Sequence, residues 1–282
     1  MEFSLITNDS MVAAVAQSAG VERIFIDLER LGKDVRQKGR QLFLSTHEPS
    51  DIARLHRGLS RSKLIVRIDP PHPGTLAQVD FAIDSGADYV MLPFFHSVHE
   101  ARQFIECVAG RAQPVLLVET RESAEQLSQL VKLPGLSEVH LGLNDLSISR
   151  GCRFLFDLIS DGTVSELCRI LREASIPFGF GGIGSLSRTD LPVSPELVLA
   201  YQIYEGATRG WLGRTFRETP CSRLRIEIGR LRDRVKYWQT ASDSRYQQMQ
   251  AMLISQINAA SRSCSGDSRS GSSTDKPSAS AA

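Results

Sequence analysis

The sequence predicts an α/β fold, a TIM (β/α)8 barrel followed by a C-terminal helical extension. Two observations lead to this prediction. Eight short apolar runs alternate with segments of helical periodicity, which is typical of parallel strands joined by helices. The 282 residues also suffice for one barrel of about 250 residues with an appendage, and leave little room for a second full domain.

The predicted strands lie at the apolar runs, and we expect the barrel to occupy residues 1–219. A further β-like piece, Gln41 to Ser45, is expected to be an insertion between the second and third strands. The strands are predicted to begin at Phe3, Ile24, Leu64, Tyr89, Val115, Val139, Phe178 and Thr208.

Composition places the chain among ordinary globular proteins. A net charge of +1 and a hydrophobic content of 41% give no electrostatic reason to expect a nucleic acid or an acidic membrane surface as partner. No apolar run approaches the ~20 residues of a spanning helix, and the N-terminus lacks a basic segment followed by an apolar core. We therefore expect a cytoplasmic protein. The five cysteines are scattered and show no CxxC spacing, so the sequence predicts neither a disulfide framework nor a zinc site.

Two neighbouring strands are each followed by an acid. Glu119 follows the apolar run Val115 to Val118, and Asp145 follows the run Val139 to Leu143. One strand–helix–strand repeat separates the acids, so parallel neighbouring strands would bring them side by side. Two adjacent carboxylates repel unless a proton or a cation lies between them, and oxygen ligands suit Mg²⁺ or Mn²⁺. The alternative is a pair of solvated loop acids beside nearby arginines.

The stretch from 116 to 151, LLVETRESAEQLSQLVKLPGLSEVHLGLNDLSISRG, resembles the metal-binding core of the HpcH/HpaI aldolase and citrate lyase β-subunit family. That family has an apolar strand ending in Glu-Thr, a helix, Pro-Gly, and then an Asp-Leu-Ser segment closed by Gly. A less specific similarity extends from about Arg23 to Phe216. The resemblance implies a barrel of the phosphoenolpyruvate/pyruvate type. It also implies that a carbon–carbon bond is made or broken next to a metal-bound 2-oxo acid or a related carboxylate.

The second strand ends in Asp27-Leu28-Glu29, which is similar to the DLED signature of the citrate lyase side of the family. Asp27 and Glu29 share a strand face, where they would hold waters of a metal ion or orient Arg67. The alternative is a surface ion-pair ladder with the basic residues that follow. Arg30 stands where many aldolases of the family carry a histidine as acid–base group, and an arginine does not give up its proton.

His47 is the predicted replacement for that base, with Glu29 in reserve. It follows an apolar run and precedes a short helix, which would place it on the rim of the barrel mouth, and imidazole titrates near ~6.5. The alternative is a solvated loop histidine. We expect the remaining histidines to be structural, with His140 a strand residue without a role: His56, His72, His96, His99 and His140.

Arg67 lies inside the apolar run of the third strand. A buried arginine is costly unless a carboxylate matches its charge. Its planar fork suits a 2-oxo acid or the enolate derived from one, and the substrate arginine of the family falls on this position. A buried ion pair with Glu29 or Glu119 is compatible with that role.

Backbone groups are expected to complete the substrate site. The family pattern implies that the N–H groups of Asn144 and Asp145 hold a substrate carboxylate. The stretch 179–184, GFGGIG, satisfies GxGxxG, but it lies late in the chain and inside an apolar run preceded by proline. We therefore interpret Gly181 and Gly182 as residues that let the seventh strand approach the ligand, and not as a dinucleotide motif.

Together these residues predict a metal-dependent lyase or aldolase that acts on a pyruvate- or oxaloacetate-like 2-oxo acid. Glu119 and Asp145 would hold Mg²⁺ or Mn²⁺, and Arg67 would stabilise the enolate. An aldehyde or a CoA thioester is the expected second reactant. Two alternatives stay open, an acyl-CoA thioester hydrolase on the same site and a non-catalytic barrel that binds a metabolite.

Residues 220–260 have a helical pattern with an apolar stripe of Leu224, Ile228, Leu231 and Val235. We expect this stripe to pack against a neighbouring subunit, because the family is typically oligomeric through such C-terminal helices. Residues 261–282 are rich in serine and almost without large apolar residues, so we expect a disordered tail.

Overall fold

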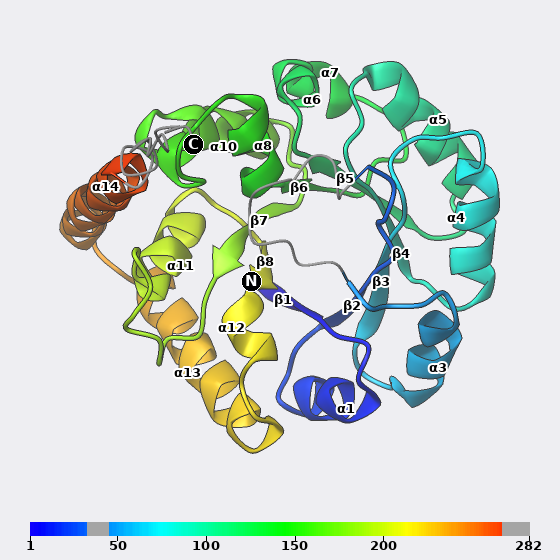
Figure 1. Cartoon of the computed structure of the whole chain (residues 1–282), viewed down its shortest axis with the longest axis horizontal. Coiled ribbons are helices and arrows are strands. Elements are labelled where there is room, and N and C mark those ends of the chain that lie inside the picture. The colour runs from blue at the N-terminus through cyan, green and yellow to red at the C-terminus, as the bar shows by residue number, and fades with distance from the viewer. Residues whose placement is uncertain (33–44, 267–282) are drawn as a thin grey trace, which may run out of the picture.

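A computed structural model describes residues 1–32 and 45–266. Its parallel strands close into a barrel in which each strand pairs with its neighbours in sequence and β8 pairs with β1 (Figure 1). This confirms the predicted TIM barrel, and every strand begins within two residues of its predicted start. The strands are β1 (Glu2–Ile6), β2 (Arg23–Asp27), β3 (Lys63–Arg67), β4 (Tyr89–Leu92), β5 (Gln113–Val118), β6 (Glu138–Leu141), β7 (Phe178–Ile183) and β8 (Arg209–Leu212).

Helices surround the barrel. The single helix that we expected between β5 and β6 is divided at Gln126 into two short helices. The helices are α1 (Ser10–Ser18), α3 (Ser50–Gly58), α4 (Thr75–Asp84), α5 (Val98–Val108), α6 (Arg121–Glu125), α7 (Leu127–Leu130), α8 (Leu143–Ser149), α9 (Asp157–Ser160), α10 (Thr163–Glu173), α11 (Pro195–Tyr204), α12 (Arg214–Arg217), α13 (Cys221–Gln239) and α14 (Asp243–Gly266).

The strands read as continuous apolar runs because both of their faces are buried. Outward side chains such as Ile24 and Ile26 pack beneath the helices in the main core. Alternate side chains point inward and fill the barrel as a second apolar cluster, which comprises Phe25, Ile65, Met91, Val115 and Leu117.

An ion cluster lies at the N-terminal end of the barrel. The buried Arg23 donates from Nη1 to both carboxylate oxygens of Glu138, at 2.7 and 2.9 Å, and Arg209 Nε donates to the same carboxylate at 2.6 Å. His140 Nε2 lies 2.7 Å from Glu138, and its ring stacks on Trp211. Burial raises the pKa of Glu138, but the hydrogen bonds from His140 and Arg23 and the nearby positive charge lower it to about 2. His140 therefore belongs to a buried structural cluster.

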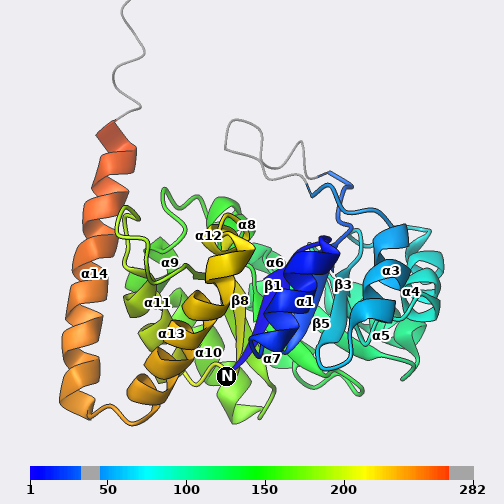
Figure 2. The ribbon, with the colours of Figure 1, turned by 90° about the horizontal axis from the view of Figure 1, so that it is seen from below.

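The C-terminal extension consists of two helices that lie against the barrel of the same chain. Helix α13 packs along α1 and α11, and α14 packs along α11 and α9, so that α14 stands at the outside of the molecule (Figures 1 and 2). The predicted stripe on α13 is buried, but its cover is this chain's own barrel. The stripe therefore does not require a neighbouring subunit.

Helix α14 also covers α11, whose sequence is apolar almost all round. Because α14 lies over its outer side, α11 is buried from Leu197 to Gln202. Helix α14 runs to Gly266, past the boundary at residue 260 that we expected. The rest of the predicted tail lies outside the described residues, as does the β-like piece except for Ser45. No helix in the described part of the chain is both long and apolar enough to cross a membrane.

Candidate active site at the C-terminal mouth of the barrel

Most of the predicted site residues lie where the strands end. Figure 2 shows β1 rising from the N-terminus at the bottom, with α8 and α12, which follow β6 and β8, at the top. Asp27 and Arg67 are the last residues of β2 and β3, and Glu119 follows β5 directly. Asp145 lies in the first turn of α8. TIM-barrel enzymes carry their active sites at this end.

Arg67 is held rigidly by two acids from the end of β2. Its Nε and Nη2 each donate to one carboxylate oxygen of Asp27 at 2.8 Å, which is a bidentate pair. Nη2 also lies 3.3 Å from Glu29 Oε2. The pair forms because Asp27 and Arg67 are direct neighbours in the register of β2 and β3. Asp27 and Glu29 therefore orient Arg67, which is one of the two roles that we predicted for them.

Arg67 stays positively charged, and one nitrogen of its guanidinium, Nη1, can still donate a hydrogen bond. Burial lowers its pKa, but the charges of Asp27, Glu29 and Glu119 outweigh this effect and raise the pKa above its ordinary value. Nη1 makes no hydrogen bond to any described residue, and the side chain is 11% exposed. Nη1 can therefore donate to an oxygen of a bound anion.

Glu119 turns from the end of β5 toward the end of β6. Its Oε1 accepts a hydrogen bond from the backbone N–H of Phe94 at 3.0 Å, and Phe94 has a left-handed φ of 46°. The carboxylate lies against Gly142, where a Cβ would approach Oε2 to 2.5 Å. Gly142 thus leaves the space that lets Glu119 reach the start of α8, three residues before Asp145.

The donor set at this place fits a hard divalent cation. Both side chains supply oxygen only, both are buried, and Asp145 Oδ1 is steadied by Asn144 Nδ2 at 3.2 Å. Across residues 1–32 and 45–266, no three His, Cys, Asp or Glu side chains form a metal cage by themselves. Mg²⁺ needs no such cage, because it is commonly held by one or two carboxylates together with waters and substrate oxygens. Glu119 and Asp145 are the residues that would hold it.

His47 is buried at the end of β2, with its Nδ1 engaged by the backbone. The N–H of Asp27 donates to Nδ1 at 2.9 Å. Nδ1 must therefore carry the lone pair, and a neutral imidazole then keeps its proton on Nε2. In this arrangement the ring can donate a hydrogen bond from Nε2 but has no free lone pair for a substrate proton. This geometry argues against His47 as the base and favours a donor role.

Arg30 points away from the mouth and fixes a loop. Its guanidinium donates to the backbone oxygen of His47 at 3.0 Å and to Glu48 at 2.8 Å. Its own N–H donates to Asp69, which also accepts the amide of Leu31. Arg30 therefore helps to place His47, and it does not replace the acid–base histidine of the aldolases.

The two glycines of β7 lie at a break in the strand pairing. The register between β7 and β8 shifts between Phe180 and Ile183. Gly182 adopts a φ of 100°, and a Cβ there would press on Phe156, whereas a Cβ on Gly181 would meet open space. The backbone conformation and the contact with Phe156 therefore explain the glycine at position 182. At Gly181, open space remains on the side toward which a Cβ would point.

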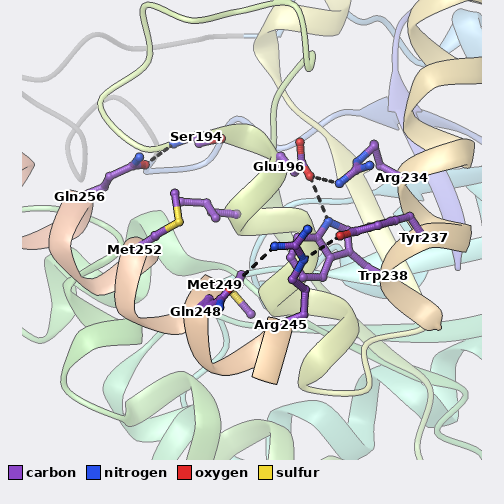
Figure 3. Close-up of a pocket in the computed structure, with 11 residues that line it drawn as sticks. Ser194, Glu196, Arg234, Tyr237, Trp238, Arg245, Gln248, Met249, Met252 and Gln256 are labelled. Carbon is purple, nitrogen blue, oxygen red and sulfur yellow. Dashed lines mark hydrogen bonds and ion pairs between the residues drawn. The ribbon is translucent and has the colours of Figure 1, made fainter. Parts of the chain in front are cut away.

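A hollow of about 310 Å³ lies outside the barrel between α11, α13 and α14 (Figure 3). Its acid, Glu196, is already bound by Arg234 and by Trp238 Nε1, and Arg245 donates to the hydroxyl of Tyr237. It belongs to the outer helices, whereas the acids and Arg67 lie at the strand ends. We therefore place the active site at the mouth.

Three residues at the mouth escaped the sequence analysis. The backbone N–H of Phe94 depends on an unusual φ, for which the sequence holds no signal. Asp69, two residues beyond Arg67, is an acid after a strand and could have been found by the same rule as Glu119. Arg217 on α12 is close enough to Asp27 for the acid to counteract the lowering of its pKa, which arises mainly from burial and from Arg214.

Comparisons with known proteins agree with this architecture. No protein-family model and no curated protein matches the chain. Among solved structures, an HpcH/HpaI aldolase/citrate lyase family protein from Burkholderia cenocepacia J2315 is 14% identical, with a TM-score of 0.58 over 82% of this chain and 93% of that one. This chain and that protein share the barrel fold.

Two further structures show the same likeness. An HpcH/HpaI aldolase from Desulfitobacterium hafniense DCB-2 is 14% identical, with a TM-score of 0.57 over 86% of this chain and 94% of that one. A citrate lyase from Burkholderia xenovorans LB400 is 14% identical, with a TM-score of 0.58 over 92% of each chain. At such identities the shared property is the barrel fold, and the chemistry has to be argued from the site.

Proposed function

We propose that this protein is a metal-dependent carbon–carbon lyase of the aldolase or citrate lyase type that acts on a 2-oxo acid such as pyruvate or oxaloacetate. The observation that carries the proposal is the open Nη1 of Arg67. This cation is fixed by Asp27 and Glu29 at the mouth, and Glu119 contributes to its electrostatic environment. The fold shared with HpcH/HpaI aldolases supports the same class of reaction.

The reaction requires a place for developing negative charge. In the cleavage direction, the bond between C3 and C4 of a 4-hydroxy-2-oxo acid breaks, and its electron pair becomes the enolate of the 2-oxo acid. The 4-hydroxyl group loses its proton to a base, and an aldehyde leaves. Arg67 Nη1 would meet the charge that develops on the enolate oxygen. When bound at Glu119 and Asp145, a divalent cation supplies Lewis-acid polarisation of the 2-oxo group.

Glu29 is the better candidate for the proton-accepting group. A carboxylate is an acceptor, whereas His47 already uses its Nδ1 to accept the Asp27 amide. Glu29 lies beside the same guanidinium that would bind the enolate. In this assignment His47 is a neutral hydrogen-bond donor and not the base. The predicted roles of the two residues are thus exchanged.

The substrate carboxylate would be held at the first turn of α8. In this assignment the backbone N–H groups of Asn144 and Asp145, in a turn that no side chain caps, would donate to it. The open space at Gly181, on the neighbouring strand β7, would take the ligand. The second reactant, an aldehyde or a CoA thioester, would enter from the mouth.

Solvent exchange of the methyl protons of pyruvate tests the proposal without knowledge of the second reactant. Wild-type protein with Mg²⁺ or Mn²⁺ in D2O should make the methyl signal decay in NMR spectra. Arg67→Ala should slow this exchange by about 10²–10³-fold, which is the usual cost of removing one charge-stabilising donor. Glu29→Gln should abolish proton abstraction, and His47→Ala should cause a smaller loss.

Arg169→Gln is the control, because Arg169 is paired with Glu166 and Glu173 on the surface of α10 and should keep wild-type exchange. If Glu29→Gln exchanges at the wild-type rate while His47→Ala does not, the roles revert to our first expectation. If no metal supports exchange and oxaloacetate also stays intact, the protein is not this lyase. A thioester hydrolase or a metabolite-binding barrel would then be the better hypothesis.

A further inference from the structure

We propose that the C-terminal extension is part of the active-site scaffold, with Glu227 of α13 as the positioning residue for loop 184–194. That loop follows β7 and borders the mouth. The inference rests on the proposed function only in taking the barrel mouth as the place of the reaction. The contacts that carry it are independent of any reaction.

Glu227 reaches from the outer helix into the start of the loop. It is 6% exposed, and its two oxygens accept hydrogen bonds from the hydroxyl groups of Ser185, at 2.6 Å, and Ser187. Arg230 Nη1 lies 3.0 Å from one of these oxygens and also donates to Ser187. Burial raises the pKa of Glu227, but the hydrogen bonds from the serines and the charge of Arg230 lower it, so the group stays ionised. An ionised, buried acceptor holds its donors firmly.

The same contact continues into the loop after β8. The N–H of Ser185 donates to Thr215 Oγ1 in α12 at 2.7 Å, and the N–H of Gly213 donates to the carbonyl oxygen of Ile183 at 2.7 Å. Glu227 therefore fixes Ser185, and Ser185 fixes α12. Helix α12 carries Arg217, which interacts electrostatically with Asp27. A shift of Ser185 would thus be passed through α12 to Arg217, and Arg217 acts on Asp27, the partner of Arg67.

The extension holds the far end of the loop as well. Gln256 of α14 accepts the N–H of Ser194, the residue before α11, at 2.8 Å (Figure 3). Both ends of loop 184–194 are therefore tied to helices that come after the barrel in sequence. A loop tied in this way is preorganised. Because reaction rates depend on the exact placement of groups around the reacting centre, even a small displacement of the loop would lower the rate.

Glu196 provides a matched control. It is also an acid at the interface between the barrel helices and α13, where it binds Arg234 and Trp238 Nε1 (Figure 3). Its contacts connect α11 with α13 and do not reach a mouth loop. Glu196→Gln therefore removes a comparable contact of the extension and leaves the hydrogen bonds of loop 184–194 and α12 in place.

The experiment compares Glu227→Gln, Thr215→Val and Glu196→Gln with wild type in pyruvate exchange, at saturating metal and varied pyruvate. Glu227→Gln should lose about 10- to 100-fold in the ratio of rate to KM, because a small misplacement of binding groups has effects of this size. Thr215→Val, which breaks the next link, should change in the same direction. Glu196→Gln should keep wild-type kinetics. Metal affinity measured by calorimetry should be equal in all four, because the hydrogen bonds of Glu227, Thr215 and Glu196 involve helix α13 and the segments after β7 and β8, whereas Glu119 and Asp145 follow β5 and β6.

Hydrogen exchange followed by mass spectrometry provides a readout that needs no activity. In Glu227→Gln, the amides of 184–190 and 213–219 should exchange faster, while those of β3 keep their wild-type rates. Wild-type kinetics together with unchanged exchange in both segments would overturn the inference. A wild-type protein without pyruvate exchange would instead refute the proposed function, and the amide exchange would still decide whether Glu227 positions the two loops.

Discussion

The buried arginines Arg23 and Arg67 are each matched by a carboxylate from another strand of the barrel. Arg67 sits in a buried strand, and Asp27 on the next strand meets it with two hydrogen bonds at 2.8 Å. At the other end of the barrel, Arg23 of β2 donates from Nη1 to both carboxylate oxygens of Glu138 on the non-adjacent strand β6. A buried pair of this kind is strongly destabilised when one partner is removed, because the other charge stays behind.

Glu138→Gln should therefore lower the free energy of unfolding at neutral pH by about 3–5 kcal/mol. The pKa of Glu138 is about 2 in the folded protein, below the ~4.3 of an unfolded glutamate. Its stabilising effect is therefore complete above about pH 5 and is lost as the pH falls toward 2. The stability difference between wild type and variant should shrink on acidification, by up to about 1.4 kcal/mol per pH unit. Chemical denaturation at several pH values measures this.

Glu166→Gln is the comparison for that experiment. Glu166 forms a solvent-exposed pair with Arg169 on α10, and such pairs contribute little to stability. Its substitution should leave the stability curve close to that of wild type. A difference between wild type and Glu138→Gln that stays constant from pH 6 to pH 3 would contradict the assignment of a lowered pKa.

Residue-level features were predictable where a side chain contradicts its surroundings. The position of Arg67 in an apolar strand predicted a carboxylate partner. Asp27 and Glu29, which share one strand face, indicated where such carboxylates lie. The tautomer of His47 could not be predicted, because it depends on the N–H of Asp27, a backbone group twenty residues away in sequence. The chemistry of a side chain can be read from the sequence, whereas the hydrogen-bond partners of backbone groups depend on the fold.

At the scale of elements, the unit from β5 to α8 is the best predicted part of the site. β5 ends directly before Glu119, β6 ends at Leu141 with Asp145 in the first turn of the following helix, and parallel pairing brings the two strand ends together. The break between α6 and α7 was not predictable from periodicity, since the apolar spacing continues across Gln126. The sequence also gave no reason for glycine at position 142, which the structure supplies through its contact with Glu119.

Gly142→Ala tests this contact directly. The new Cβ would lie 2.5 Å from Glu119 Oε2, so the carboxylate would have to turn away from the start of α8. The backbone at residue 142 has a φ of −86°, which alanine tolerates, so the fold should persist. Titration calorimetry should show metal affinity reduced by about tenfold or more, in line with the loss caused by disturbing the surroundings of a metal ligand.

Gly181→Ala is the matched control, because its Cβ would meet no atom within 4 Å. It should bind metal as wild type does, whatever its effect on the substrate. Equal and undiminished metal affinity in both glycine variants would remove Glu119 from the metal site.

At the scale of the whole molecule, the extension was predicted as helical but its partner was misassigned. The apolar stripe on α13 was taken to need another subunit, whereas α1 and α11 of the same chain cover it. The signal that could have corrected this lies in α11, which is apolar on almost all sides and therefore needs a cover beyond the barrel. Homo-oligomerisation stays a prediction, and it now needs a surface other than this stripe.

Deletion of residues 243–282 should therefore destabilise the monomer and not merely change its oligomeric state. Helix α14 buries Met249, Leu253 and Ile257 against the body, and each such side chain contributes about 1.5–3 kcal/mol. Their loss, together with the exposure of α11, is comparable to the total stability of an ordinary domain. The control removes only residues 267–282 and should melt like wild type. Thermal unfolding with light scattering should show a strongly lowered Tm and aggregation for the longer deletion alone, whereas a well-folded smaller species with the wild-type Tm would mean that α14 is dispensable to the barrel.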